Sequence, residues 1–204
     1  MPHAVVRIYA NSGSLLDTAR EQQARIVDAM RDVPGLQMYS VSGDSASATA
    51  VTITVCDDKT GTDESVKRAA ATVKELLPDA NIAPPRILEG DLILRLTAED
   101  LASRTGNPYV SLRLYHNAMP EELAEHEADL KEALSAIPQW RNSAGFVDEA
   151  TGHAVVVSAV DDEASAETVA QAIRTWGEAA FPEFSKTLSP PEVITASRLY
   201  RHDA

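Results

Sequence analysis

The sequence predicts an α+β protein built from two tandem copies of one β-α-β-β-α-β unit. Three observations lead to this prediction. A short strand motif occurs twice, the turn and helix-stop signals divide both halves into the same order of elements, and matching landmarks in the two halves keep a nearly constant spacing. The chain of 204 residues is long enough for two units of about 100 residues, each with its own small core.

The repeated motif is Val-Arg-Ile-Tyr-Ala-Asn at 6–11 and Leu-Arg-Leu-Tyr-His-Asn at 112–117. In both copies Arg, Tyr and Asn stand two residues apart, so the three side chains share one face of a β-strand. These polar triplets are Arg7, Tyr9 and Asn11 in the first copy and Arg113, Tyr115 and Asn117 in the second.

The first half then follows a regular order of hydrophobic periods and turn signals. We expect a strand at 3–10, a helix at 15–33 that ends before Pro34-Gly35, two hairpin strands at 36–41 and 48–56, a helix at 62–77 and a strand at 87–96.

The second half repeats that order. We expect a strand at 112–117, a helix from Pro120 to about 137, hairpin strands at 140–147 and 153–160, a helix at 165–181, and a last strand that ends near Arg201. Proline suits the first position of a helix, and the paired prolines at 84–85 and 190–191 precede the final strand of each half.

The spacing between the halves supports a duplication. The step from Arg7 to Arg113 is 106 residues, the step from Asp57 to Asp161 is 104, and the step from Pro84 to Pro190 is again 106. Both changes of spacing fall in predicted loops, where insertions cost little. We therefore assign residues 1–97 to one repeat, 98–108 to a linker and 109–204 to the other repeat.

The β-α-β-β-α-β order is the split-βαβ, ferredoxin-like pattern. Right-handed crossovers place both helices of a unit on one face of an antiparallel sheet. The other face must then be covered by something, and the second copy in the same chain is a self-complementary partner. Two such sheets can close into a barrel around an interior space.

The duplicated unit resembles the dimeric α+β barrel superfamily, in particular its antibiotic-biosynthesis-monooxygenase-like (ABM-like) members. The resemblance rests on the strand Val5–Tyr9, the helix end Val33-Pro-Gly-Leu36, the strand 51–58 and the helix start 61–70, and it covers most of the chain once per half. Because this superfamily contains several kinds of enzyme, the resemblance predicts the fold more firmly than the function.

The polar triplets are the first candidate site. If Val6 and Ile8 lie under the helices, both triplets face the barrel interior. The resemblance implies a cofactor-independent monooxygenase that oxidises a phenolic or quinol-like substrate. We would then expect Arg113 and Asn117 to stabilise the substrate anion and Tyr115 to donate a proton, with substrate contacts from the first triplet, Arg7, Tyr9 and Asn11. The alternative is a hydrogen-bond network that only holds the two sheets together.

A second candidate lies at the start of the strand at 140–147. Trp140 and Asn142 are expected on one face, where the first half has the apolar residues Leu36 and Met38. This asymmetry suggests that one half has kept a substrate pocket and the other has become a scaffold. The alternative is that Trp140 only fills the core.

Charge and composition exclude other classes of function. The chain carries 18 Lys and Arg against 31 Asp and Glu, a net charge of −13, with no basic stripe, so we expect no nucleic-acid partner. Apolar runs stay far below the roughly 20 residues that span a bilayer, so we expect no membrane segment and a cytoplasmic protein. Cys56 is the single cysteine and is expected to be a buried hydrophobe.

Neither a metal nor another cofactor is expected. The five histidines lack a convincing metal-ligand spacing. Within the superfamily, the haem-degrading branch uses a strand Asn, a helix Trp and a following His. Asn117 and Trp176 match the first two, but residues 177–184 contain no histidine. The expected partner is a small aromatic or hydrophobic molecule, bound by a monomer with pseudo-two-fold symmetry or by a homodimer. The alternative is a non-catalytic ligand-binding or structural module.

Overall fold

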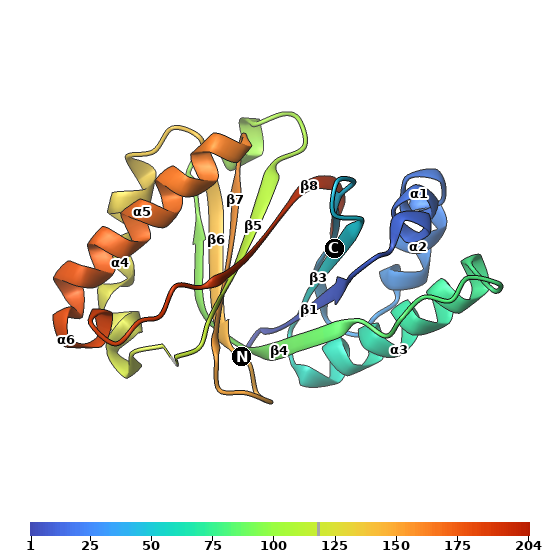
Figure 1. Ribbon diagram of the computed structural model, residues 1–204, viewed down its shortest axis with the longest axis horizontal. Coiled ribbons are helices and arrows are strands. Elements are labelled where there is room, and N and C mark those ends of the chain that lie inside the picture. Colours follow the sequence, from blue (N-terminus) through green and yellow to red (C-terminus); the bar gives the residue numbers. More distant parts are fainter. Residues whose placement is uncertain (118) are drawn as a thin grey trace. The chain divides into compact units, whose positions relative to one another are not determined.

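The computed structural model describes residues 1–117 and 119–204. The chain divides into two compact units. The N-terminal unit contains residues 1–91 and 196–204, and the C-terminal unit contains residues 92–195. Each unit is an antiparallel sheet covered on one face by helices (Figure 1).

The elements of the first half are β1 (His3–Tyr9), α1 (Gly13–Glu21), α2 (Gln23–Arg31), β2 (Leu36–Asp44), β3 (Thr49–Cys56), α3 (Lys59–Leu76) and β4 (Arg86–Thr97). Those of the second half are η1 (Leu101–Ser103), β5 (Tyr109–Tyr115), η2 (Glu121–His126), α4 (Glu127–Ser135), β6 (Trp140–Val147), β7 (Ala154–Val160), α5 (Glu163–Ala180), α6 (Pro182–Ser185) and β8 (Glu192–Asp203).

The strands hydrogen-bond in the order β1-β3-β2-β8-β5-β7-β6-β4. Within this order the first half contributes β4-β1-β3-β2 and the second half contributes β8-β5-β7-β6, so β1 and β5 hold equivalent places. The α+β class and the two ferredoxin-like repeats predicted from the sequence are confirmed.

Strand β4 runs through both units, and so does β8. Residues 86–91 of β4 pair with β1, whereas residues 92–97 pair with β6. In the same way residues 197–203 of β8 pair with β2 in the N-terminal unit. The compact units therefore differ from the sequence repeats. Residues 92–97 of β4 belong to the C-terminal unit, and residues 196–203 of β8 belong to the N-terminal unit. The repeat boundaries at 97 and 109 stay a prediction from the sequence.

The first helix of each repeat is interrupted. The predicted helix at 15–33 is two helices, α1 and α2, which meet at Gln22. Its counterpart begins as the 3₁₀ turn η2 and continues as α4. The second helix of each repeat is continuous for 18 residues and starts at an aspartate N-cap, Asp58 for α3 and Asp162 for α5. These aspartates are 104 residues apart, so the cap was duplicated with the helix.

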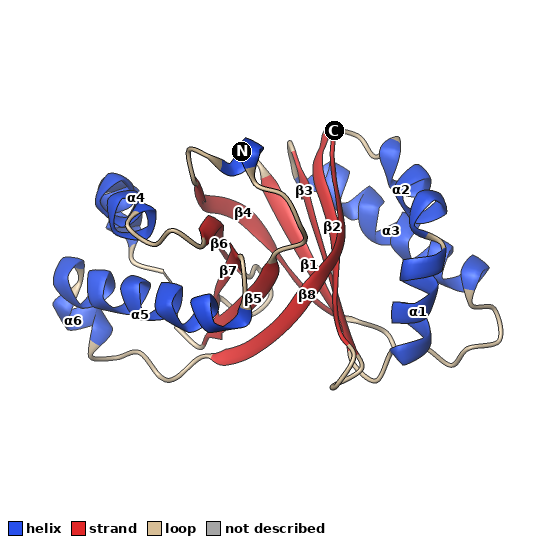
Figure 2. Ribbon diagram, turned by 90° about the horizontal axis from the view of Figure 1, so that it is seen from above, coloured by secondary structure: helices blue, strands red, loops and turns tan. Residues whose placement is uncertain are grey.

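Helices cover the same face of the sheet in both units (Figure 2). Helix α3 packs on β1 and β3, and α5 packs on β5 and β7. The C-terminal core gathers Trp140 from β6, Leu130 and Leu134 from α4, and Val169 from α5. Within the part of the chain that the structure describes, no helix is long and apolar enough to cross a membrane.

Candidate functional site: a cavity between sheet and helices

The polar triplets face the helices of their own units. Arg7 donates from Nη1 to Thr54 Oγ1 at 3.0 Å and from Nη2 to the hydroxyl of Ser65, which lies on α3. Arg113 donates from Nη2 to the Ala166 carbonyl at 3.3 Å and to Glu167 Oε2 at 3.2 Å, both on α5. The expectation that Val6 and Ile8 lie under the helices is therefore wrong.

The reason is that β1 is buried on both faces. All seven of its residues are buried, so the hydrophobic pattern carries no information about which face the helices cover. Strand β5 is likewise buried over 110–114. The shared face of Arg and Tyr within each copy was predicted correctly, but it was assigned to the wrong side of the sheet.

The two asparagines do not continue these faces. Asn11 follows the end of β1 with a φ of 51°, in the left-handed region that asparagine tolerates, and it is exposed. Asn117 is half-buried and donates from Nδ2 to the Thr187 carbonyl at 3.4 Å, in the loop between α6 and β8. Neither side chain lines either of the two cavities described below, so only Arg and Tyr of each polar triplet share a face toward the helices.

Tyr9 and Tyr115 each line a cavity between the sheet and the helices of their own unit. The cavity of the C-terminal unit has a volume of about 390 Å³, which falls within the usual range for small-molecule sites. Its wall is mostly apolar and aromatic. It is formed by Leu94, Tyr115, Met119, Pro120, Leu123, Leu130, Ser143, Ala154, Val156, Ile173, Arg174, Trp176, Gly177, Glu178, Phe181, Phe184, Ser185, Leu188, Ser189, Pro190 and Pro191.

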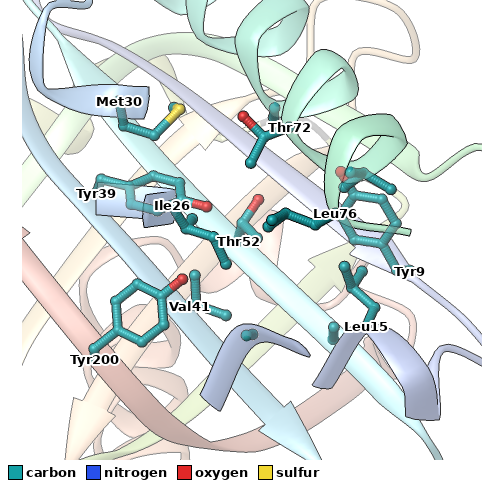
Figure 3. A pocket seen from close by; sticks show the side chains of 14 residues that line it. Tyr9, Leu15, Ile26, Met30, Tyr39, Val41, Thr52, Thr72, Leu76 and Tyr200 are labelled. Atoms are coloured by element: carbon teal, nitrogen blue, oxygen red, sulfur yellow. The ribbon is translucent and has the colours of Figure 1, made fainter. Parts of the chain in front are cut away.

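The cavity of the N-terminal unit has a volume of only about 40 Å³, little more than the share of liquid volume that one water takes. Figure 3 shows Tyr39 from β2 and Tyr200 from β8 pointing their hydroxyls into it, beside Tyr9 and Thr52. The rings of Tyr39 and Tyr200 lie with their centroids 6.4 Å apart. These two side chains fill the space that stays open in the other unit.

The two cavities occupy equivalent positions in the duplicated fold. The registers prove the equivalence: Tyr9 pairs with Ala50 as Tyr115 pairs with Ala154. Val41 pairs with Tyr200 at the place where Gly145 pairs with Leu94. Three exchanges in the sheet favour the larger volume of the C-terminal cavity, namely Tyr39 for Ser143, Val41 for Gly145 and Tyr200 for Leu94. Each exchange puts the smaller side chain in the C-terminal unit.

Trp140 and Asn142 do not share a face, contrary to the expectation. A β-bulge at this point pairs Trp140 with Val160 but Asn142 with Ala159. Trp140 is fully buried, packs in the core and donates from Nε1 to Ser143 Oγ at 3.0 Å. The residue that lines the cavity from this strand is Ser143, and Asn142 projects from the opposite face. The same bulge occurs between Leu36 and Met38 in the first half.

Burial keeps the phenols of both cavities neutral. It raises the pKa of Tyr115, although the charges of Arg113 and Arg174 oppose the rise. It also raises the pKa of Tyr39 and, with the neighbouring Tyr39 phenol adding to the effect, that of Tyr200. At neutral pH these side chains are hydrogen-bond donors rather than bases.

Arg7 is a buried cation held by hydroxyl groups. Its exposed fraction is 1%, and burial lowers its pKa below the ordinary arginine value. Within residues 1–117 and 119–204 no carboxylate forms an ion pair with it. Thr52, Thr54 and Ser65 supply its acceptors. Arg113, in contrast, reaches the exposed carboxylate of Glu167. The hydrogen bonds of Arg7 therefore differ from the alternative drawn from the sequence, because they tie β1 to β3 and α3 within one unit and do not join the two sheets.

The described residues contain no group of three or more His, Cys, Asp or Glu side chains that could hold a metal ion. The cavity wall of the C-terminal unit carries three charged or titratable side chains, Tyr115, Arg174 and Glu178, and no histidine among the described residues. These side chains and the hydroxyls of Ser143, Ser185 and Ser189 are the polar side chains that the chain itself offers in this cavity.

Comparison with known proteins identifies the fold. No family model matches the sequence, and no curated protein matches it. Solved structures do match over the whole length. A candidate monooxygenase from Fusobacterium nucleatum superposes with a TM-score of 0.70 at 11% identity, covering 99% of this chain and 94% of its own. One from Lactobacillus acidophilus gives 0.68 at 11% identity, covering 99% and 96%.

An anthrone oxidase-like protein also matches, with a TM-score of 0.61 at 15% identity over 100% of this chain and 93% of its own. At these identities the likeness establishes the fold alone, and the chemistry has to be inferred from the cavity.

Sequence reasoning missed the residues that open this cavity. Leu94, Ser143 and Gly145 have no chemical motif of their own and look like ordinary strand residues. An alignment of the two halves could have pointed to these residues. At the spacings of 104 and 106 residues, each of them is smaller than its counterpart in the N-terminal unit, which is a tyrosine or a valine.

Proposed function

We propose that this dimeric α+β barrel protein binds a small aromatic or hydrophobic molecule in the cavity of the C-terminal unit. We further propose that it oxidises a phenolic or quinol-like substrate there with O₂ and without a cofactor. The observation that carries the proposal is the contrast in volume, about 390 Å³ against about 40 Å³, at equivalent positions of one duplicated fold. Packed cores leave few such voids unless function keeps them open.

Tyr115 is the proposed catalytic residue. Oxidation by O₂ begins with loss of a proton from the substrate to solvent water, which leaves an electron-rich anion, and a proton is taken back when water is formed from O₂. O₂ accepts the electrons, one of its oxygen atoms enters the substrate and the other leaves as water. A neutral phenol in an apolar cavity can donate a hydrogen bond to the developing oxyanion, and such a donor is worth more where water is excluded.

Arg113 is a proposed positioning residue. It lies two residues before Tyr115 on the same face of β5, and its positive charge acts on the Tyr115 phenol. Its guanidinium is tied to α5 through Ala166 and Glu167, which fixes the strand against the helix. The proposed part of Asn117 is to hold the loop at Thr187, next to the cavity residues Leu188 and Ser189.

The names of the structural neighbours agree with this proposal. Two are candidate monooxygenases and one is anthrone oxidase-like. Anthrones are aromatic molecules whose oxidation to a quinone fits the atom balance given above. At 11% to 15% identity these names support the choice of reaction to test and assign no substrate.

A second candidate function is ligand binding without catalysis. The specific observation in its favour is the shortage of titratable groups on the cavity wall, where Glu178 is the single carboxylate among the described lining residues. A substrate that does not ionise readily in solution would find few bases here.

Oxygen consumption separates these functions. We would supply anthrones and hydroquinones to the wild-type protein, to Tyr115→Phe and to the matched variant Tyr9→Phe, which removes the equivalent hydroxyl from the filled cavity. We expect Tyr115→Phe to lower kcat by about a hundredfold, the usual loss for an oxyanion donor, and Tyr9→Phe to have a small effect. Binding of these molecules without any O₂ uptake would favour the non-catalytic alternative, and equal losses in both variants would contradict the role of Tyr115.

A further inference from the structure

The ligand class can be narrowed from the charges around Tyr115, on the assumption that the proposed ligand cavity is correct. We propose that Arg174 is an anion-binding residue of this cavity, so that the preferred ligand is an aromatic molecule carrying an acidic group. The acidic group would lie between the Arg174 guanidinium and the Tyr115 hydroxyl, and the ring system would fill the apolar remainder of the cavity.

Arg174 differs from most cations of its unit in lacking a carboxylate. Arg104, Arg113 and Arg141 each form an ion pair with an aspartate or glutamate. Arg174 lies on α5 at the cavity wall and donates from Nη1 to Gln171 Oε1 at 3.3 Å, and within the described chain no acidic side chain forms an ion pair with it. Its remaining N–H donors are therefore available to a ligand.

The local charge balance favours an anion at this end of the cavity. The charged side chains that act on the Tyr115 phenol are those of Arg113, Arg174 and Glu167. Glu167 is paired with Arg113 at 3.2 Å, so these two charges offset each other. Arg174 is exposed, forms no ion pair within the described chain, and lines the same cavity as the half-buried Tyr115 hydroxyl, which is itself a donor.

The carboxylate of Glu178 lies farther along the helix. It stands four residues after Arg174, about 6 Å along the axis, and it is not among the groups that act on Tyr115. Both side chains line the cavity. The wall is therefore polarised, with its positive end at Tyr115, and a ligand with one acidic group would bind in one orientation.

The filled cavity lacks this charge. Arg174 corresponds to Ala70 on α3, at the spacing of 104 residues that relates the two helices. An arginine thus faces the cavity in the repeat where the cavity is open, whereas the equivalent position of the closed repeat holds a residue without a functional group. This contrast is expected if Arg174 serves a ligand and not the packing of the helix.

Two isosteric probes test the proposal by isothermal titration calorimetry. The anion 2-naphthoate and the neutral 2-naphthamide have the same ring system and nearly the same size. We would titrate both into the wild-type protein, Arg174→Gln and Arg174→Lys. The control is Lys131→Gln, which removes one exposed positive charge from α4 outside the cavity lining.

We expect Arg174→Gln to raise the Kd of 2-naphthoate by about tenfold or more, as for loss of a charge-assisted hydrogen bond. The Kd of 2-naphthamide should stay within about twofold. Arg174→Lys should keep most of the preference for the anion, and Lys131→Gln should behave as the wild type. The same tenfold loss from Lys131→Gln would indicate a long-range charge effect and would overturn the proposal.

A failure of the proposed anion subsite can be distinguished from a failure of the proposed ligand cavity. If both probes bind the wild type and Arg174→Gln changes neither Kd, the anion subsite is overturned while the ligand cavity stands. If neither probe binds the wild type, the proposed ligand cavity is overturned and the anion subsite with it.

Discussion

Tyr39 and Tyr200 lie side by side at the N-terminal cavity (Figure 3), with ring centroids 6.4 Å apart and ring planes tilted by 52°, and their counterparts in the C-terminal unit are Ser143 and Leu94. The phenols are the physical reason that one cavity is filled and the other is open. Both side chains come from the sheet, on neighbouring strands β2 and β8, so they can be exchanged without altering the helices. The difference between the two cavities thus lies in a few strand residues.

Opening the filled cavity should create a second binding site. In the double variant Tyr39→Ser and Tyr200→Leu we expect a neutral aromatic such as 2-naphthamide to bind with a stoichiometry of two per chain. Removing two buried rings should also cost about 3–5 kcal/mol of unfolding free energy, because the cavity cannot collapse fully. Calorimetry gives the stoichiometry and denaturant unfolding gives the cost. A variant that folds yet binds a single ligand would contradict the equivalence of the cavities.

The buried phenols should make the protein sensitive to alkali. Burial raises the folded-state pKa of Tyr39, Tyr115 and Tyr200. Below about pH 10, the unfolded pKa, the stabilising contribution is fully present. As the pH rises further, the unfolded chain loses protons that the folded chain retains, so stability falls. Tyrosinate absorbance should therefore rise together with the loss of far-UV circular dichroism, and a normal titration of all tyrosines before unfolding would contradict this expectation.

The stability of the protein at acidic pH should depend on the N-cap of α5. Asp162 accepts hydrogen bonds from the backbone N–H and the hydroxyl of Ser165, and these bonds lower its pKa. Its contribution is present above the unfolded carboxyl pKa and is lost as the pH falls through the lower folded value. We expect Asp162→Ala to lower the Tm at neutral pH and to have a smaller effect in strong acid. An effect on Tm that is equal at both pH values would exclude a role for the ionised carboxylate.

Arg7 offers a test of buried-charge energetics. Ser65→Ala should cost about 1–3 kcal/mol, because it leaves a buried guanidinium N–H without its acceptor. Arg7→Met should cost less than Ser65→Ala although it alters more atoms, because the desolvation penalty of an uncompensated cation disappears. Chemical unfolding of the two single variants and the double variant measures both values. A larger loss in Arg7→Met would mean that the cation stabilises the fold.

Much of the architecture could be predicted from the repeat. The nearly constant spacing of Arg7 and Arg113, Asp57 and Asp161, and Pro84 and Pro190 indicates two copies of one unit. The order of strands and helices then follows from hydrophobic periods and turn signals, and the observed strand order confirms it. Periodicity is a reliable guide here because the helices are long and each has one apolar face.

The site was harder to predict, for two physical reasons. Strand β1 is buried on both sides, so alternation could not say which side faces the helices, and Arg7 was assigned to the wrong one. A β-bulge after Trp140 then reverses the faces of the residues that follow, and a bulge leaves no mark in the sequence. The C-terminal unit does contain the larger of the two cavities, and Ser143 lines it whereas its neighbour Asn142 does not; a substrate pocket there stays a prediction.

The most direct test is to fill the open cavity in the way that the other unit is filled. In Ser143→Tyr a phenol takes the position equivalent to Tyr39 and projects into the cavity of about 390 Å³. Titration calorimetry with 2-naphthamide should give one ligand per chain for the wild-type protein and no binding for a folded Ser143→Tyr variant. Unchanged affinity in this variant, or two ligands per wild-type chain, would contradict the account.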